Sequence, residues 1–294
     1  MENRYENFVH ENELGTTYSK NYVNPPIPEG YKHVEGRWNN GFVIERTSDG
    51  SQFVWVPVGS LDSNGTLDGV SFNEKFGRRI YRKNPIFLEQ FTEPLVDELK
   101  LQFESVKKYG GFYISRYNIS KNLKTGKPQS IKGSLPCAHI DFSEAQELAS
   151  TMEISDTITS HLTFGAEYDS VLEWFIHSGA RTLAEIVLSS TYWGNYKNTS
   201  YSSVKNGEYR YTKCSPNMIA NTGYWEEWKT NNIYDFAGNV SEWTQEKFYD
   251  LCPVVRGGSY YCNGVCFPAA YRSKFSPTKN IDESTGFRVV LLLL

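Results

Sequence analysis

Hydrophobic and polar positions divide the chain into a polar start, a series of short apolar runs and a loop-rich second half. Residues 1–30 are mostly polar and contain a proline-rich stretch at 24–28, which predicts an N-terminal arm followed by a linker. Runs of β-branched and aromatic side chains at 41–44 and 52–58 flank a Ser-Asp-Gly turn, which predicts a β-hairpin. The folded domain is therefore expected to span residues 31–294.

Further along the chain, the patterns predict two helices among strands and loops. Residues 59–105 are polar and irregular, which predicts a solvated loop, and residues 110–117 predict a strand. Ser143 and Gln146 have the spacing of a capping box at the start of a first helix. Apolar side chains at helical spacing between positions 168 and 176 predict a second helix, which ends at the Ser-Gly pair that follows.

The second half of the chain has few periodic runs. From residue 190 onward it is rich in Gly, Asn, Ser, Thr and Tyr, and its dense aromatic side chains argue against disorder. We therefore expect long ordered loops of the kind that carry function. The final run at 289–294 is far shorter than the roughly 20 apolar residues that cross a bilayer, so it predicts a buried last strand.

Composition narrows the function classes. The chain has 294 residues, a formal net charge of -4 and no run of Lys or Arg, which argues against a surface that follows nucleic-acid phosphates. Aromatic residues make up 15%, led by 20 Tyr, and Tyr-rich surfaces are typical of binding sites. Without a signal-peptide or membrane-spanning pattern, a protein made in the cytoplasm that does not insert into membranes is expected. Five cysteines cannot all pair, so reduced thiols are expected.

Three segments in order resemble the signature of the formylglycine-generating-enzyme (sulfatase-modifying factor) family. They are NIYDFAGNVSEWT at 232–244, VRGGSY at 255–260 and GFR at 286–288, and the resemblance covers roughly residues 40–294. It implies an α+β, C-type-lectin-like fold with short strands, two helices and long ordered loops. This expectation agrees with the pattern of apolar runs and loops along the chain.

The resemblance also implies a calcium ion in the loop of the first segment. By position, Asp235 and Glu242 would offer carboxylates, and Gly238 and Val240 would offer backbone carbonyls. Hard cations prefer such oxygen ligands. The alternative is that Asp235 caps a turn and Glu242 is an ordinary hydrogen-bonded carboxylate.

In the working enzymes of this family, two cysteines after the Gly-Gly-Ser-Tyr segment bind copper and activate oxygen, which oxidises a substrate cysteine. Cys262 falls at the first position, but Cys266 follows it by four residues where the family has five. Ser241 also stands where the family usually has Trp. Thiolates suit Cu(I), so catalytic use of Cys262 and Cys266 stays an alternative to two thiols, free or joined locally, without a catalytic role.

The layout is most like that of the non-catalytic variable proteins of diversity-generating retroelements, which occur in phages and bacteria. In these proteins a diversified stretch follows the Arg-Gly-Gly segment and ends near the Gly-Phe-Arg strand. Arg272 and Pro268 are interpreted as framework residues that hold this stretch. The residues predicted to contact ligand are Tyr260, Tyr261, Cys262, Asn263, Val265, Cys266, Phe267, Ser273 and Phe275.

The sequence thus predicts a recognition protein that displays a variable C-terminal surface. Its partner would be a protein or glycan on a cell or particle, and its setting a phage particle or bacterial surface, with assembly into an oligomer left open. The alternative function is a copper-dependent formylglycine-generating oxidase acting on a peptide cysteine. Calcium would be structural under either function, and copper belongs only to the alternative.

Overall fold

The protein has a mixed α+β architecture with several sheets and helices, as expected from the sequence. The computed structural model describes residues 25–58, 76–78, 90–199, 201–205, 208–212, 218–274 and 283–294. The predicted arm at 1–30 lies outside these residues apart from its last six, and most of the predicted loop at 59–105 lies outside them as well.

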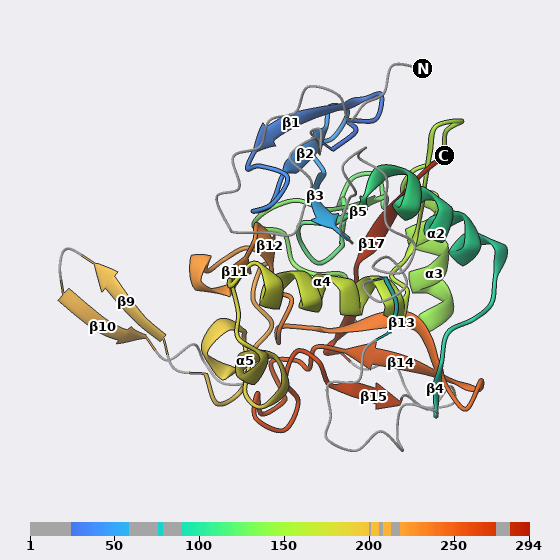
Figure 1. Ribbon diagram of the computed structural model, residues 1–294. Coiled ribbons are helices and arrows are strands. Elements are labelled where there is room, and N and C mark those ends of the chain that lie inside the picture. Colours follow the sequence, from blue (N-terminus) through green and yellow to red (C-terminus); the bar gives the residue numbers. More distant parts are fainter. Residues whose placement is uncertain are drawn as a thin grey trace.

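The larger sheet has six strands, which include the first and the last strand of the described chain (Figure 1). Its order is β1 (Tyr31–Glu35), β2 (Val43–Arg46), β3 (Gln52–Pro57), β5 (Gly111–Ser115), β17 (Val289–Leu293) and β8 (Ile158–Leu162). Strands β2 and β3 pair antiparallel, which confirms the predicted hairpin. Strand β17 lies between β5 and β8 and is buried along its length, which confirms the predicted last strand.

Helix α2 (Asp97–Tyr109) corrects the prediction of a loop up to residue 105. Its buried face includes Gln102 and Ser105 beside Leu99 and Val106, so the apolar stripe that signals a helix is weak in the sequence. The helix ends at Gly110, whose positive φ of 83° suits a residue without a side chain. It packs against β5 and β17 of the larger sheet.

Three further α-helices follow among the described residues, and the first two of them are those that the sequence predicted. Helix α3 (Phe142–Thr151) begins two residues before the predicted capping box, because the Asp141 side chain accepts a hydrogen bond from the backbone N–H of Glu144 at 2.8 Å. Helix α4 (Gly165–His177) ends at Ser178, as predicted. The short helix α5 (Leu183–Val187) begins with a capping box formed by its own Thr and Glu.

The smaller sheet is built from the three family-like segments. Its strand order is β15 (Arg272–Lys274), β14 (Cys252–Arg256), β13 (Ser241–Phe248) and β16 (Thr285–Phe287), and β4 (Phe91–Thr92) pairs with the far end of β13. Three two-stranded pairs complete the described strands: β6 (Ser120–Lys121) with β7 (Pro128–Gln129), β9 (Tyr201–Lys205) with β10 (Glu208–Thr212), and β11 (Lys229–Thr230) with β12 (Ile233–Tyr234).

Helix α4 joins the two sheets. It contacts β3 of the larger sheet and β13 of the smaller one, and it crosses the centre of the molecule in Figure 1. Tyr168 of this helix stacks on Phe236 at a ring-centroid distance of 4.4 Å, and Phe175 meets the same ring edge-on. Phe236 of the first family-like segment therefore packs in the core against helix α4, where stacked rings add to the burial of apolar area.

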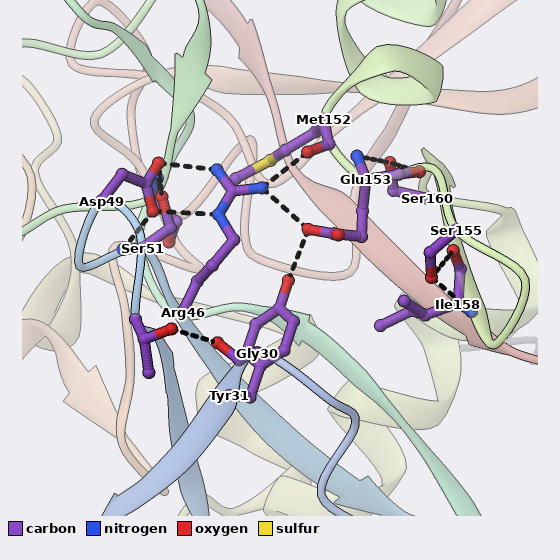
Figure 2. Close-up of polar contacts among 12 residues, drawn as sticks. Gly30, Tyr31, Arg46, Asp49, Ser51, Met152, Glu153, Ser155, Ile158 and Ser160 are labelled. Carbon is purple, nitrogen blue, oxygen red and sulfur yellow. Dashed lines mark hydrogen bonds and ion pairs between the residues drawn. The ribbon is translucent and has the colours of Figure 1, made fainter.

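A polar network ties the first hairpin to the connection between α3 and β8 (Figure 2). The Arg46 guanidinium lies between two carboxylates, at 2.6 Å from Asp49 and 2.8 Å from Glu153. It also donates to the backbone carbonyl of Met152 at 2.6 Å, and the Tyr31 hydroxyl donates to Glu153 at 2.9 Å. The edge strand β1 and its neighbour β2 are therefore attached to the body by charge-assisted hydrogen bonds as well as by strand pairing.

Candidate functional site

Strand alternation gives the smaller sheet two chemically different faces. In one cross-strand row, Glu242 of β13 lies opposite Arg256 of β14, which lies opposite Arg272 of β15. In the next row, Val255 lies opposite Ser273. Because successive side chains of a strand point to opposite faces, the charged row and the Val255–Ser273 row face opposite ways.

The charged face is closed by buried ion pairs with Asp169 of helix α4 and Glu246 of β13. Arg256 lies 2.6 Å from Asp169 and 2.9 Å from Glu246, and all three side chains are inaccessible to solvent. Arg272 contacts the same two carboxylates, with Nε at 2.9 Å from Glu246. Two positive and two negative side chains thus compensate one another, as buried charges require. The structure therefore places Arg272 as support for strand β15, which agrees with its predicted framework role.

Glu93 extends this charged region to the start of helix α4. Its carboxylate accepts hydrogen bonds from the backbone N–H groups of Gly165 and Ala166, each at 2.8 Å, which satisfies two free donors of the helix end. Burial raises the pKa of Glu93 to about 8, and the nearby carboxylate of Glu246 raises it as well. The group therefore stays protonated in the folded protein at pH values where it is ionised in the unfolded chain.

This difference predicts a pH dependence of stability. Because folding raises the pKa of Glu93, the contribution of this residue to the free energy of unfolding is fully present below the ordinary pKa of 4.5. This contribution is lost as the pH rises through about 8. Relative to Glu93→Gln, the wild type should lose at most about 1.4 kcal/mol per pH unit across this window. Urea unfolding at pH 5 to about 9 measures it. Glu104→Gln, on the exposed side of α2, is the control, and a difference from Glu93→Gln that does not change with pH would contradict the prediction.

The opposite face of the sheet carries a small pocket. It has a volume of about 190 Å³ and lies where the strands meet the loop that follows β14. Its lining residues are Ser241, Val255, Gly258, Ser259, Tyr261, Cys262, Phe267, Tyr271, Ser273, Ser284 and Thr285. The pocket therefore combines hydroxyl groups, aromatic rings and one thiol.

The loop at 260–267 borders this pocket and is held by hydrogen bonds to the segment at 190–198. The Gly264 N–H donates to the Asn198 side chain at 2.9 Å, and its carbonyl accepts from the Ser190 N–H at 3.0 Å. A Cβ on Gly264 would lie 2.9 Å from the backbone nitrogen of Thr191, so the close approach requires glycine. The loop backbone is therefore fixed in place before any ligand arrives.

The predicted contact residues differ in exposure. Tyr261 and Val265 are 51% and 56% exposed, and Cys266 is exposed as well. Tyr260 is 6% exposed, and its N–H donates to the Asn239 carbonyl at 3.0 Å, so it supports the loop and is unsuited to contact a ligand.

The remaining predicted contact residues are half-buried or undescribed. Cys262, Phe267 and Ser273 are half-buried and line the pocket with Tyr261. Asn263 is half-buried, and its side chain accepts from the Val265 N–H at 2.9 Å, so it shapes the turn. Phe275 lies outside the described residues.

Sequence reasoning missed the part of the pocket that comes from outside the loop. Ser241 on β13 and Thr285 on β16 are opposite one another in a parallel pair, and both line the pocket. Ser241 lies within the first family-like segment and Thr285 directly precedes the third, so alternation along these strands was the signal that could have located them. Tyr271 also lines the pocket and was missed, although it is a Tyr like the predicted contacts Tyr260 and Tyr261.

The two cysteines of the copper alternative have different surroundings. Cys262 is half-buried at the pocket wall, with its sulfur 3.5 Å from the Ser259 hydroxyl, whereas Cys266 is exposed and is not among the lining residues. Both are free thiols. Within the described part of the chain, no three His, Cys, Asp or Glu side chains gather as metal ligands do.

The predicted calcium residues lie in a buried loop with partly satisfied carboxylates. Asp235 accepts hydrogen bonds from the Thr222 hydroxyl at 2.7 Å and the Gly223 N–H at 2.8 Å. Glu242 is 2.6 Å from Arg288 and accepts from Asn118 at 2.7 Å. One oxygen each of Asp235, Glu242 and Asn118 is buried without a hydrogen-bond partner among the described residues. These free oxygens fit a hard cation, although Arg288 already compensates one carboxylate.

Burial raises the pKa of both carboxyls. The pKa of Asp235 lies above its ordinary value because the group is desolvated, and the pKa of Glu242 rises to about 7 for the same reason despite the opposing charge of Arg288. A bound cation would favour the ionised forms and lower both pKa values. The residues that would hold it are Asp235 and Glu242, with backbone carbonyls of Gly238 and Val240.

Calcium binding at this loop therefore predicts a measurable stabilisation. At a free Ca²⁺ concentration about 100 times the Kd, the free energy of unfolding should rise by about 2.7 kcal/mol relative to EDTA. Because protons compete for the same carboxyls, the gain should be smaller at pH 6 than at pH 8. Thermal unfolding of the wild type and Asp235→Asn, each with Ca²⁺ and with EDTA, measures it. Equal shifts in both proteins would place any calcium elsewhere.

Comparison with known proteins agrees with the fold and the three segments. Residues 44–293 match the sulfatase-modifying factor enzyme 1-like domain, and the chain belongs to this family. Among solved structures, the chain is similar to Treponema denticola variable protein 1, at 15% sequence identity and a TM-score of 0.31 over 82% of this chain and 84% of that one. No curated protein matches the chain. Among the described residues, no helix is long and apolar enough to span a membrane.

Proposed function

We propose that the protein is a recognition module that binds its partner without covalent chemistry, through the pocket and the adjoining loop at 260–267. The observation that carries this proposal is the combination of exposed Tyr261 and Val265 with a backbone held on both sides by hydrogen bonds. A preorganised surface loses little conformational entropy on binding. Tyr at such a surface offers a wide contact area with few rotatable bonds.

The buried, charged face of the smaller sheet also supports this proposal. Arg256 and Arg272 anchor strands β14 and β15 to helix α4, whereas the pocket and the exposed side chains lie on the other face. Changes in Tyr261 or Val265 would therefore leave the buried ion pairs untouched. Such a separation suits a surface whose side chains vary, as in the variable proteins of diversity-generating retroelements. We extend the proposal to a protein or glycan partner and to a setting on a phage particle or bacterial surface.

The alternative function, a copper-dependent oxidase, is favoured by one observation, the presence of the Cys262 thiol at the pocket wall. Under that function Cys262 and Cys266 would hold Cu(I), which favours thiolate ligands. The exposed position of Cys266 outside the pocket lining weighs against a shared site.

The test of the proposed function is a binding screen with two probe sets. The purified protein is offered to an array of neutral and sialylated glycans and to a phage-displayed library of random peptides. A reproducible ligand from either set is expected, and Tyr261→Ala should weaken its binding by about tenfold or more if this residue is a central contact. Tyr249→Ala is the matched control, because Tyr249 is 56% exposed at the far end of β13.

The same screen separates the two functions. Replacing Cys266, which lies outside the pocket lining, by Ser should change ligand binding much less than Tyr261→Ala under the recognition function and should abolish Cu(I) binding under the oxidase function. A protein that selects no ligand from either set, yet binds Cu(I) and oxidises a peptide thiol in the presence of oxygen, would refute the proposal.

A further inference from the structure

We infer that the pocket accommodates one uncharged, hydroxyl-bearing ring, namely a neutral pyranose residue of a glycan, and holds it by direct contacts without a bridging cation. This inference rests on the proposed recognition function and specifies its ligand. It is drawn from the charge, hydrogen-bonding state, aromatic content and size of the pocket.

Among the described residues, the pocket lining offers no counter-charge to an ionic ligand. None of these described lining residues is Asp, Glu, Lys, Arg or His. Arg256 and Arg272 face the other side of the sheet, where Asp169 and Glu246 compensate them. Lys274 of β15 extends over the ring of Phe248, with Nζ at 4.9 Å from the ring centroid. Because burying an unpaired charge is costly, a neutral ligand fits this pocket better than an acidic or basic one.

Three hydroxyl groups of the pocket lining have no hydrogen-bond partner among the described residues, although Ser241 and Thr285 are only 8% and 1% exposed. Among the described residues, no hydrogen bond engages the side-chain hydroxyls of Ser241, Ser273 and Thr285. They come from β13, β15 and β16, so they approach the pocket from different strands of the sheet. A hydroxyl both donates and accepts hydrogen bonds. Such groups pair well with a ligand that itself carries several hydroxyls.

Aromatic rings border these hydroxyls. Phe267 and Tyr271 meet edge to face at a centroid distance of 4.7 Å, and the exposed Tyr261 stands beside Tyr260 at 4.6 Å. The face of an aromatic ring carries partial negative charge and attracts weakly positive C–H groups. A pyranose ring presents C–H groups on its faces and hydroxyls around its rim, which matches rings next to free hydroxyls.

The size of the pocket limits the ligand to one ring. At about 190 Å³ it is smaller than the roughly 300–1,000 Å³ of sites that take drug-sized molecules. An extended peptide is instead recognised along a groove or a free strand edge, through main-chain hydrogen bonds. The concave shape and the free side-chain hydroxyls therefore favour a single sugar residue over a peptide strand.

The test uses the full chain and simple sugars as probes. Saturation-transfer NMR is recorded with the methyl glycosides of glucose, galactose and mannose and with two charged analogues, glucuronic acid and glucosamine. At least one neutral glycoside should show saturation transfer in EDTA as well as in calcium, and both charged analogues should bind more weakly. Ser273→Ala and Thr285→Val should each weaken binding by about two- to tenfold, as expected for one lost hydrogen bond. Ser150→Ala, on the exposed side of α3, should leave binding unchanged.

Each outcome bears on one of the two proposals. Binding of neutral sugars that requires calcium, or that is unaffected by the Ser273 and Thr285 variants, would overturn the inference. Selection of peptides or sialylated glycans through Tyr261, with no response to neutral sugars, would also overturn it and leave the recognition function standing. Absence of any ligand in both screens would remove the recognition function itself. Circular dichroism of each variant verifies that it is folded.

Discussion

Replacing Arg288 by methionine is expected to lower the free energy of unfolding by about 3–5 kcal/mol. The Arg288 side chain is inaccessible to solvent, with Nε 2.6 Å from Glu242 and further hydrogen bonds to the carbonyls of Ser115 and Tyr234. Without it, the Asn118 amide is the one hydrogen-bond donor that Glu242 keeps among the described residues. A buried carboxylate without its counter-charge is strongly destabilising, and a methionine of similar length does not replace the lost hydrogen bonds.

The pH dependence of this variant identifies the cause. Because the positive charge of Arg288 lowers the pKa of Glu242, its removal should raise that pKa further above about 7, and the loss of stability should be larger at pH 9 than at pH 6. Adding Glu242→Gln to Arg288→Met should recover part of the loss. Urea unfolding measures all three proteins, with Lys100→Met in an exposed ion pair as the control that should change little. A loss independent of pH would point to packing instead.

Gly258→Ala is expected to have the second-largest effect, a loss of about 2–4 kcal/mol together with a marked loss of ligand binding. Gly258 has a φ of 66°, in the left-handed region that disfavours a side chain. Its added Cβ would also lie 2.5 Å from the carbonyl oxygen of Phe267 and 3.0 Å from the ring of Tyr196. The backbone carbonyl cannot move without displacing the loop at 260–267, so strain and overpacking should act together.

Gly133→Ala separates the two contributions. Gly133 has a comparable φ of 80°, but no atom lies within 4 Å of an added Cβ. Its variant should therefore show only the conformational cost, about 1–2 kcal/mol. Thermal unfolding and binding of the ligand found in the screen are measured for both variants. If Gly133→Ala were as destabilising as Gly258→Ala, or if Gly258→Ala bound ligand normally, the tight contact with Phe267 would not hold the loop.

Much of the fold could be predicted because its signals are local. The hairpin at β2 and β3 follows from β-branched runs around a turn, and β17 follows from an uninterrupted apolar run. Helix α2 was not predicted because polar side chains occupy half of its buried positions. Burial there depends on tertiary contacts and not on periodicity. The start of α3 was misplaced because Asp141–Glu144 and Ser143–Gln146 have the same capping spacing, and only the first pair is used.

The candidate site was predictable only in part. The three family-like segments located the loop after β14, and four of the expected residues line the pocket: Tyr261, Cys262, Phe267 and Ser273. The burial of Tyr260 and the structural use of Asn263 depend on contacts with Asn239 and Val265, which residue type does not reveal. The contribution of Ser241 and Thr285 depends on the pairing of β13 with β16, more than 40 positions apart in the chain.

The position of β17 between two other strands of the larger sheet has a consequence for biosynthesis. Strands β5 and β8 are adjacent to β17 on either side, so neither can complete its pairing before residues 289–293 have been translated. During elongation the nascent chain would therefore expose unpaired edges and apolar surface, which makes such species prone to aggregate. Pairing of the larger sheet therefore waits for the synthesis of β17, and chaperones that shield exposed strand edges should matter for the yield of native protein.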